Sequence, residues 1–270
     1  MKKIIIFCLA VCTLSSGYTQ EQKNDTIKVG GMIIIKKAGK EQQNGRTIEI
    51  PRRRYNRENV STNWWILDLG FSNYTDNTDY AMAQSSGFVD MGISEDQLKV
   101  RSGKSRNVNL WFFMQRLNMI EHVVNLKYGL GLELNNYFYD YETIRFEKNP
   151  TFITTDATGL KDAKKNKLAA DYLTVPIMLN VNFTPNKRNG FGISGGVSAG
   201  YLYSARQKIK QNGSISKLKN DFDLDRWKVC YIGELLLGPV KLYGSYSLNN
   251  MWEKGLDQTP YTFGFRLSNW

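Results

Sequence analysis

The stretch from Val123 to Tyr139 alternates apolar and polar residues over more positions than a soluble strand needs. One parity is apolar or aromatic, and consists of Leu126, Tyr128, Leu130, Leu132 and Leu134, while the other carries Asn125, Lys127, Gly129, Gly131, Glu133 and Asn135. An extended chain places alternate side chains on opposite faces. Soluble strands average about 5 to 6 residues, whereas a membrane-crossing strand needs about 9 to 11. The pattern therefore predicts a strand that crosses a bilayer.

Seven further segments have strand-like patterns, and the connections between all eight alternate between long and short. The segments are Trp64–Ser72, Arg106–Gln115, Leu168–Phe183, Phe191–Tyr203, Leu224–Leu237, Val240–Asn249 and Tyr261–Leu267. Outer-membrane barrels have an even number of antiparallel strands, long outer loops and short periplasmic turns. Closure into a ring pairs edge amides that would each cost several kcal/mol in hydrocarbon.

These patterns predict an all-β fold, an eight-stranded antiparallel up-and-down transmembrane β-barrel. A soluble barrel of the lipocalin type is the alternative, but it would be apolar inside and polar outside. The chain contains 15 Tyr, 13 Phe and 6 Trp, which suits aromatic girdles at the two membrane interfaces. After the first twenty residues no apolar run reaches the length of about 18 that a membrane-spanning helix needs.

The N-terminus has the pattern of an export signal. Met1-Lys2-Lys3 precedes the apolar run Ile4–Leu14, which is too short to span a bilayer as a helix. A lipoprotein signal at Leu9-Ala10-Val11-Cys12 is a weaker alternative, because Val11 is bulky where a small residue is expected. We expect residues 1–19 to be a signal peptide and the cell outer membrane to be the destination. Cleavage would leave Cys230 alone, which excludes an internal disulfide.

The next segment, residues 20–63, differs in composition from the barrel domain predicted for residues 64–270. Its beginning, DTIKVGGMIIIKK, reads as one or two short strands, and the remainder is polar and contains the basic run Arg52–Arg54. We expect a periplasmic N-terminal tail or linker. The arginines either contact anionic envelope components or are simply hydrated.

Charged residues occur at inward-facing positions of the predicted strands. The set is Asp68, Lys127, Glu133, Lys228, Glu234, Lys241 and Arg266. An eight-stranded barrel is only wide enough inside for side chains to fill it. We therefore expect these charges to pair as a plug, since buried charges persist by pairing. A proton or ion path is the alternative.

Lysines gather in the predicted outer loops. One group is Lys161, Lys164, Lys165 and Lys167, and the candidate glycolipid-binding loop carries Lys208, Lys210, Lys217 and Lys219. The net charge of +11 would suggest nucleic acid in a cytosolic protein, but an exported barrel would meet outer-membrane lipid and lipopolysaccharide phosphates instead. A merely hydrated loop is the alternative.

The sequence offers no catalytic residue, metal site or cofactor site. The single histidine, His122, falls in a short turn on the predicted periplasmic side, so a hydrolase couple at the outer rim would have no base. Asp221, Asp223 and Asp225 alternate at a loop edge, but they lack the glycine and terminal glutamate of a calcium loop. We therefore expect a protein that is not an enzyme.

Four segments resemble the PorT-like outer-membrane β-barrel proteins. They are AADYLTVPIMLNVNF (Ala169–Phe183), GFGISGGVSAGYLYS (Gly190–Ser204), GLGLELNNY (Gly129–Tyr137) and YGSYSLNNMW (Tyr243–Trp252). The resemblance covers Trp64 to Trp270 and implies an eight-stranded barrel in the outer membrane. It implies no catalytic residue, because many members have no known activity and one is associated with a protein-secretion apparatus. Within this match Pro176 lacks a ladder donor, so we expect a local bulge there.

The last residue, Trp270, is a candidate signal for assembly of the barrel in the outer membrane. Barrels of this kind usually end in an aromatic residue that the barrel assembly machinery recognises, yet Trp270 is on the opposite parity from Tyr261, Phe263, Phe265 and Leu267.

The first functional hypothesis is a structural or interaction protein of the cell envelope with a side-chain-filled lumen. The alternative is a small pore or transport protein, or an accessory component of a protein-secretion apparatus.

Overall fold

The computed structural model describes residues 26–29, 32–35, 58–185, 187 and 190–268. The chain divides into two units, Met1–Arg53 and Arg54–Trp270. In the first unit, β1 (Thr26–Val29) pairs antiparallel with β2 (Met32–Ile35), which confirms the prediction of short strands there. The expected signal peptide, the run Arg52–Arg54 and the terminal Trp270 lie outside the described residues.

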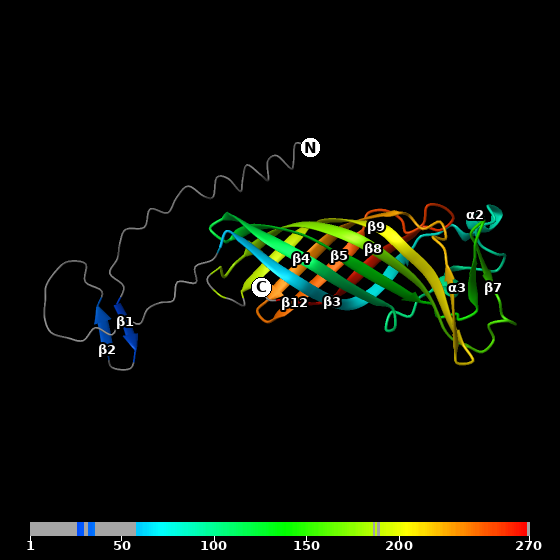
Figure 1. Cartoon of the computed structure of the whole chain (residues 1–270), viewed down its shortest axis with the longest axis horizontal. Helices are drawn as coiled ribbons and strands as arrows, with labels where there is room; N and C mark the ends of the chain where they lie inside the picture. The colour runs from blue at the N-terminus through cyan, green and yellow to red at the C-terminus, as the bar shows by residue number, and fades with distance from the viewer. Residues whose placement is uncertain (1–25, 30–31, 36–57, 186, 188–189, 269–270) are drawn as a thin grey trace, which may run out of the picture. The chain divides into compact units, whose positions relative to one another are not determined.

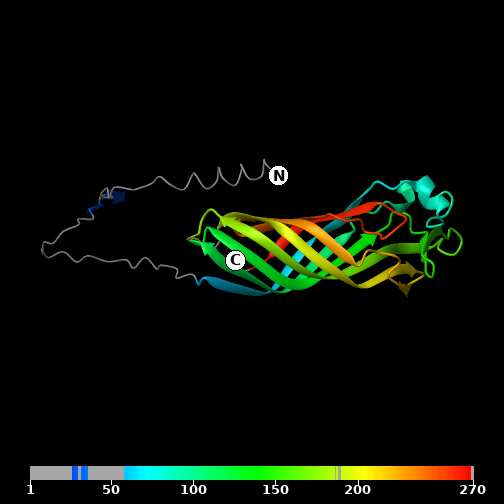
Figure 2. The same ribbon diagram turned by 90° about the horizontal axis from the view of Figure 1, so that it is seen from above.

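Eight strands of the second unit close into a ring (Figures 1 and 2). They are β3 (Val60–Asp76), β4 (Arg106–Ile120), β5 (Val124–Phe138), β8 (Ala163–Asn182), β9 (Phe191–Gln211), β11 (Trp227–Leu237), β12 (Val240–Ser247) and β13 (Gln258–Leu267). Their order is β9-β11-β12-β13-β3-β4-β5-β8, and an antiparallel β8–β9 pairing closes the circle. Every pairing is antiparallel, so the predicted eight-stranded barrel is confirmed.

Side chains alternate between the two faces of the barrel wall as the sequence pattern requires. In β5 the burial alternates along all 15 residues, with Lys127 and Glu133 on the buried face. The outward parity of β8 is apolar, and its side chains Leu173, Val175, Ile177 and Leu179 are 41–53% exposed. An apolar surface outside and a polar interior invert the arrangement of a soluble barrel and match a barrel set in lipid.

Aromatic rings border this apolar belt at both ends. At the end with short connections, four rings pack as the pairs Trp64–Phe113 and Trp65–Phe112, with ring centroids 5.9 Å apart in each pair. The backbone is irregular at both strands there, because Trp65 has a φ of 58° and Phe112 interrupts the β4–β5 register. At the opposite end Tyr201 packs against Trp227 at 5.1 Å. Such rings suit the two headgroup levels of a bilayer.

The expectation of a bulge at Pro176 is wrong. Across β5 and β8, Tyr128 lies opposite Ile177 and Gly131 lies opposite Thr174, so the register is the same on both sides of the proline. On the β9 side Pro176 pairs with Ser198 without a shift. The pairing is interrupted only at the two positions between these pairs. Proline lacks one backbone N–H donor, and the sheet accommodates the loss of that single hydrogen bond without a change of register.

The long connections fold into an ordered cap at one end of the barrel (Figures 1 and 2). The cap contains α2 (Tyr80–Ser85), α3 (Glu95–Leu98), the hairpin of β6 (Ile144–Glu147) and β7 (Phe152–Thr155), and β10 (Ser214–Lys219), which extends β9. Its core is apolar and includes Phe88, Ile93, Leu98, Tyr139, Ile144, Phe146, Ile153, Phe222, Trp252 and Leu256. Sequence periodicity did not predict this core, because the cap elements are only four to six residues long, too short to show a repeating pattern.

Polar contacts attach the cap to the barrel rim. Asp76, at the end of β3, accepts hydrogen bonds from the Tyr80 hydroxyl and from Gln258 Nε2, each at 2.7 Å. Burial and this hydrogen bond to Asp76 raise the pKa of Tyr80 above its ordinary value. Among the described residues no helix is both long and apolar enough to cross a membrane.

Candidate functional site: the polar lumen and the basic face

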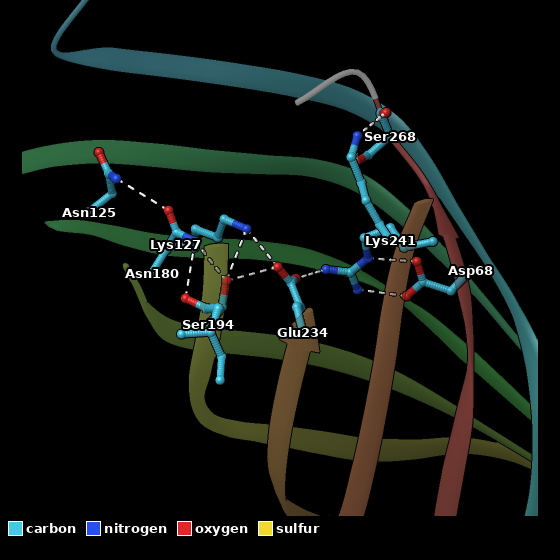
Figure 3. Close-up of polar contacts among 10 residues, drawn as sticks. Asp68, Asn125, Lys127, Asn180, Ser194, Glu234, Lys241 and Ser268 are labelled. Carbon is cyan, nitrogen blue, oxygen red and sulfur yellow. Dashed lines mark hydrogen bonds and ion pairs between the residues drawn. The ribbon is translucent and has the colours of Figure 1, made fainter. Parts of the chain in front are cut away.

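Four charged side chains from four strands form a chain of ion pairs across the lumen (Figure 3). Lys127 Nζ lies 2.6 Å from Glu234 Oε2. Arg266 pairs with the other oxygen of Glu234 and forms a fork with Asp68, with Nε–Oδ1 at 2.7 Å and Nη2–Oδ2 at 2.6 Å. This chain ties β5, β11, β13 and β3 together through the barrel interior.

A second pair, Lys228 with Glu133, belongs to the same network. Three asparagines join it to Asp68: Asn135 donates to Glu133 at 3.1 Å, Asn107 donates to both Asn135 and Asn109 at 2.9 Å, and Asn109 donates to Asp68 at 3.2 Å. Three cations therefore face three anions within one hydrogen-bonded structure. Buried ion pairs are tolerated in this way, when additional hydrogen bonds satisfy their remaining donors and acceptors.

The seventh predicted charge, Lys241, is held differently. Its ammonium donates to the Ser268 carbonyl oxygen and, at 2.9 Å, to the Ser268 hydroxyl, near the end of β13. All seven predicted residues lie in the barrel interior and are at most 7% exposed. The inward parity of the strands was sufficient to place them, but it did not indicate which charges meet.

Several partners of these charges were missed by the sequence reasoning. Trp111 donates its indole N–H to Asp68 at 2.7 Å, and Tyr243 donates its hydroxyl to Asn107 at 2.5 Å. Gly70 leaves room for this tyrosine, because a Cβ there would collide with the Tyr243 hydroxyl. The asparagines carried the available signal, since they recur at inward positions of β4 and β5.

The network continues toward the end with short turns. Lys127 also contacts the Ser194 hydroxyl at 3.2 Å, Asn180 donates to Ser194 at 3.1 Å, and Asn125 donates to Asn180 at 3.2 Å (Figure 3). A cavity of about 30 Å³ remains beside Trp111, Tyr243 and Arg266. A water molecule needs at least about 10–15 Å³ of such space, so this cavity has room for one or two waters.

The four lysines of the candidate glycolipid-binding loop are not in a loop, which corrects the prediction. Lys208 and Lys210 lie in β9, and Lys217 and Lys219 lie in β10, so that they form a β-hairpin that extends from the barrel wall. The prediction ended the strand where the apolar alternation ended. The pairing continues regardless, because backbone hydrogen bonds do not require an apolar face.

A bulge decides which way these lysines face. Between β8 and β9, Tyr172 pairs with Leu202 but Asp171 pairs with Ser204, which leaves Tyr203 as an extra residue in β9. Beyond it the parity of β9 is reversed. Seven cations now share the outward face of β8, β9 and β10, which we call the basic face: Lys165, Lys167, Arg206, Lys208, Lys210, Lys217 and Lys219.

The residues on the opposite face of these strands confirm this orientation. Leu168, Ala170 and Ala205 are at most 7% exposed and pack into the apolar core of the cap. On the basic face, Arg206 pairs with Asp171 at 2.5 Å, and Lys167 donates to Asn136 at 2.5 Å.

The residues considered for catalysis or metal binding have other contacts. His122 lies in the turn between β4 and β5, where its backbone N–H binds the Asn118 side chain at 2.6 Å. Asp223 pairs with Lys254 at 3.2 Å, and Asp225 accepts a hydrogen bond from Asn249 at 2.7 Å. In the part of the chain that the structure describes, no three His, Cys, Asp or Glu side chains are grouped to hold a metal ion.

Solved structures of two other proteins resemble the chain only weakly. No curated protein matched the chain. Among solved structures, the attachment invasion locus protein Ail of Yersinia pestis is 9% identical, covers 78% of this chain and 100% of its own, and has a TM-score of 0.31. A triple-mutant porin of Rhodopseudomonas blastica is also 9% identical, with coverages of 77% and 99% and a TM-score of 0.18. These low scores add nothing to the ring of strands described above.

The family comparison covers more than half of the chain. The family described as outer membrane protein beta-barrel domain matches residues 68–252, from the lumen residue Asp68 in β3 to Trp252 in the cap. The matched region includes seven of the eight ring strands, in whole or in part, and most of the lumen network. The chain therefore belongs to the outer membrane protein beta-barrel domain family and is an outer-membrane β-barrel protein.

Proposed function

We propose that this protein is a non-enzymatic, non-conducting barrel that presents an ordered cap and a basic face to components of the cell envelope. The observation that carries the proposal is the bridge formed by Arg266, which links Glu234 and Asp68 across the lumen. The cavity of about 30 Å³ beside it has room for only one or two water molecules. A side-chain-filled lumen suits a structural or interaction role rather than transport.

The proposal also orients the barrel. Long connections of outer-membrane barrels lie outside the cell and short turns lie on the periplasmic side. The cap would then face the exterior, and His122 would be on the periplasmic side. We propose export through the signal peptide at residues 1–19 and insertion by the barrel assembly machinery. With the only histidine at the opposite end, the cap has no base for a Ser-His or Asp-His couple, which supports a role other than catalysis.

The alternative functions, a small pore and a component of a secretion apparatus, require different properties of the lumen. A small pore or transport protein would need the lumen network to open, which requires breaking several buried ion pairs together. An accessory role in a protein-secretion apparatus, as the PorT-like resemblance implies for one relative, is compatible with a closed lumen and would make a protein of that apparatus the partner. Outer-membrane lipid and lipopolysaccharide are the partners that the basic face favours, and nucleic acid is not expected.

Planar-bilayer recordings of the refolded barrel test this proposal. We expect no stable conductance steps under conditions in which a porin reconstituted in parallel conducts. Fractionation of cells should find the protein with the outer membrane. Large, stable channels from the folded monomer would contradict the closed lumen and favour the pore alternative, and a soluble periplasmic protein would contradict the placement.

A further inference from the structure

We propose that a pocket at the cap end of β4, β5 and β8 binds one phosphate of a glycolipid headgroup, and that the adjoining basic face binds a second phosphate of the same headgroup. The pocket has a volume of about 400 Å³, and its lining includes Arg101, Lys104, Arg106, Lys164, Lys165 and Phe138. The inference rests on the proposed function, because that function places the cap end in the outer leaflet. The inference identifies a phosphorylated glycolipid as the partner of that surface.

The charge of the pocket indicates an anion. Arg101 is held by Asp140 at 2.9 Å and Glu142 at 2.6 Å, so its charge is already balanced. Within the described ranges, the other four cations of the lining have no carboxylate at ion-pair distance, and no Asp or Glu is among the lining residues. Four like charges around one concave site repel one another, and a phosphate offers each of them a charge-assisted hydrogen bond.

The pocket borders the lipid-facing belt, which favours an amphiphile. The Arg106 guanidinium lies over the Phe71 ring, 4.7 Å from its centroid. Val108, the next outward-facing residue of β4, is two positions away, which is about 7 Å along a strand. A ligand with acyl chains in the leaflet and phosphate at its headgroup would meet the apolar belt and the pocket together.

The basic face continues from the pocket. Lys167 lies 5.0 Å from the centroid of Phe138, a residue of the pocket lining. Beyond it, Lys167, Lys208 and Lys217 lie opposite one another across three strands, and Arg206 lies opposite Lys219. Like charges directly opposite in a sheet are destabilising. A surface that repeats this arrangement favours a partner with several negative charges, such as a diphosphorylated sugar headgroup.

Binding to the folded barrel in neutral detergent micelles tests the proposal, with diphosphorylated lipid A as the probe. We compare the wild type with a pocket variant, Lys104→Gln with Lys164→Gln, and a face variant, Lys208→Gln, Lys210→Gln, Lys217→Gln and Lys219→Gln. The matched control for the pocket variant is Lys148→Gln with Lys254→Gln, which removes two exposed lysines elsewhere in the cap. All variants are first shown to migrate as folded barrels on unheated gels.

We expect the pocket variant to bind about tenfold more weakly at low salt, because two charge-assisted hydrogen bonds to phosphate are lost. The face variant should also bind more weakly, and the control should bind as the wild type does. Wild-type binding should weaken as salt rises, since screening acts over about 8 Å at physiological ionic strength. Lipid A stripped of both phosphates should bind weakly to every form.

Three outcomes would overturn the inference. A control that loses as much affinity as the pocket variant would show that only net charge matters. Equal binding of the dephosphorylated lipid would exclude phosphate recognition. Inorganic phosphate or glucosamine 1-phosphate that competes as well as the lipid would show a site for free phosphates. The proposed function and this inference can fail separately. If the wild-type barrel conducts ions and the pocket variant binds lipid A more weakly than the wild type, the closed lumen is contradicted and the phosphate pocket is supported.

Discussion

Glu234 is the residue on which the lumen network depends most. One of its carboxylate oxygens pairs with Lys127 and the other with Arg266, and its side chain also accepts a hydrogen bond from Ser194 at 3.0 Å. Inward parity was enough to place Glu234 in the lumen from the sequence. Its two cationic partners come from β5 and β13, which are not its neighbours in the ring.

Replacing Glu234 with Gln tests the energetic role of this contact. The change leaves two buried cations with reduced compensation, and breaking a buried ion pair costs about 3–5 kcal/mol. We expect the free energy of unfolding in urea, measured on barrels folded in liposomes, to fall by that amount. The control is Glu253→Gln, because Glu253 is exposed in the cap. Equal stability of the two variants would show that the network does not stabilise the barrel.

The cap is the element that the sequence pattern described least well. Its apolar residues come from the four long connections and the adjoining strand ends, and Phe146 lies at the centre, with ring centroids 5.7 Å from Tyr139, 5.5 Å from Phe222 and 6.0 Å from Trp252. Strand and helix periods report faces of regular elements. They carry no information about residues that meet only after the ring has closed.

Changing Phe146 to Ala should loosen the cap without opening the barrel. Truncation of a buried Phe costs about 3–5 kcal/mol, and the cap strands β6 and β7 form a two-stranded sheet that is separate from the barrel sheet. We expect limited proteolysis to cut within residues 140–165 faster than in the wild type, while the membrane strands stay protected. Met91→Ala is the control, since Met91 is 84% exposed. Unchanged cleavage would mean that the cap does not depend on this core.

At the scale of the whole molecule, closure of the ring should isolate the lumen from water. Cys230 in β11 reports on this, because its side chain is on the inward parity and is 1% exposed. It is also the only cysteine that would remain after removal of residues 1–19. Its neighbours in the sheet, Ser198 and Ser247, face the same interior.

We expect a charged, water-soluble thiol reagent to leave Cys230 unmodified in the folded barrel and to modify it after unfolding in urea. The reference is Ser216→Cys in a Cys230→Ser background, because Ser216 is exposed in β10. Mass spectrometry measures the modified fraction. Rapid modification of Cys230 in the folded protein, at the rate of the reference, would reveal a water path and contradict the closed lumen.

The sequence by itself determined the number of ring strands, their antiparallel order and the face on which side chains lie within each alternating segment. It did so because alternation with a period of two is local, and because long and short connections report which strand ends lie together. The inward position of all seven lumen charges follows from that parity. The strand ends were less well defined, since β3 begins at Val60 and β9 continues to Gln211.

Only the tertiary structure decided which groups meet. The partners of Glu234 depend on the register of strands across the lumen, which no single segment encodes. The extra residue Tyr203 reverses the parity of β9 and turns its last cations outward, an effect that is invisible until the two strands are paired. The phosphate pocket draws its cations from the loop before β4, from β4 itself and from the start of β8. The pairing of β4 with β5 and of β5 with β8 brings these segments together, and local patterns cannot show contacts that strand pairing creates.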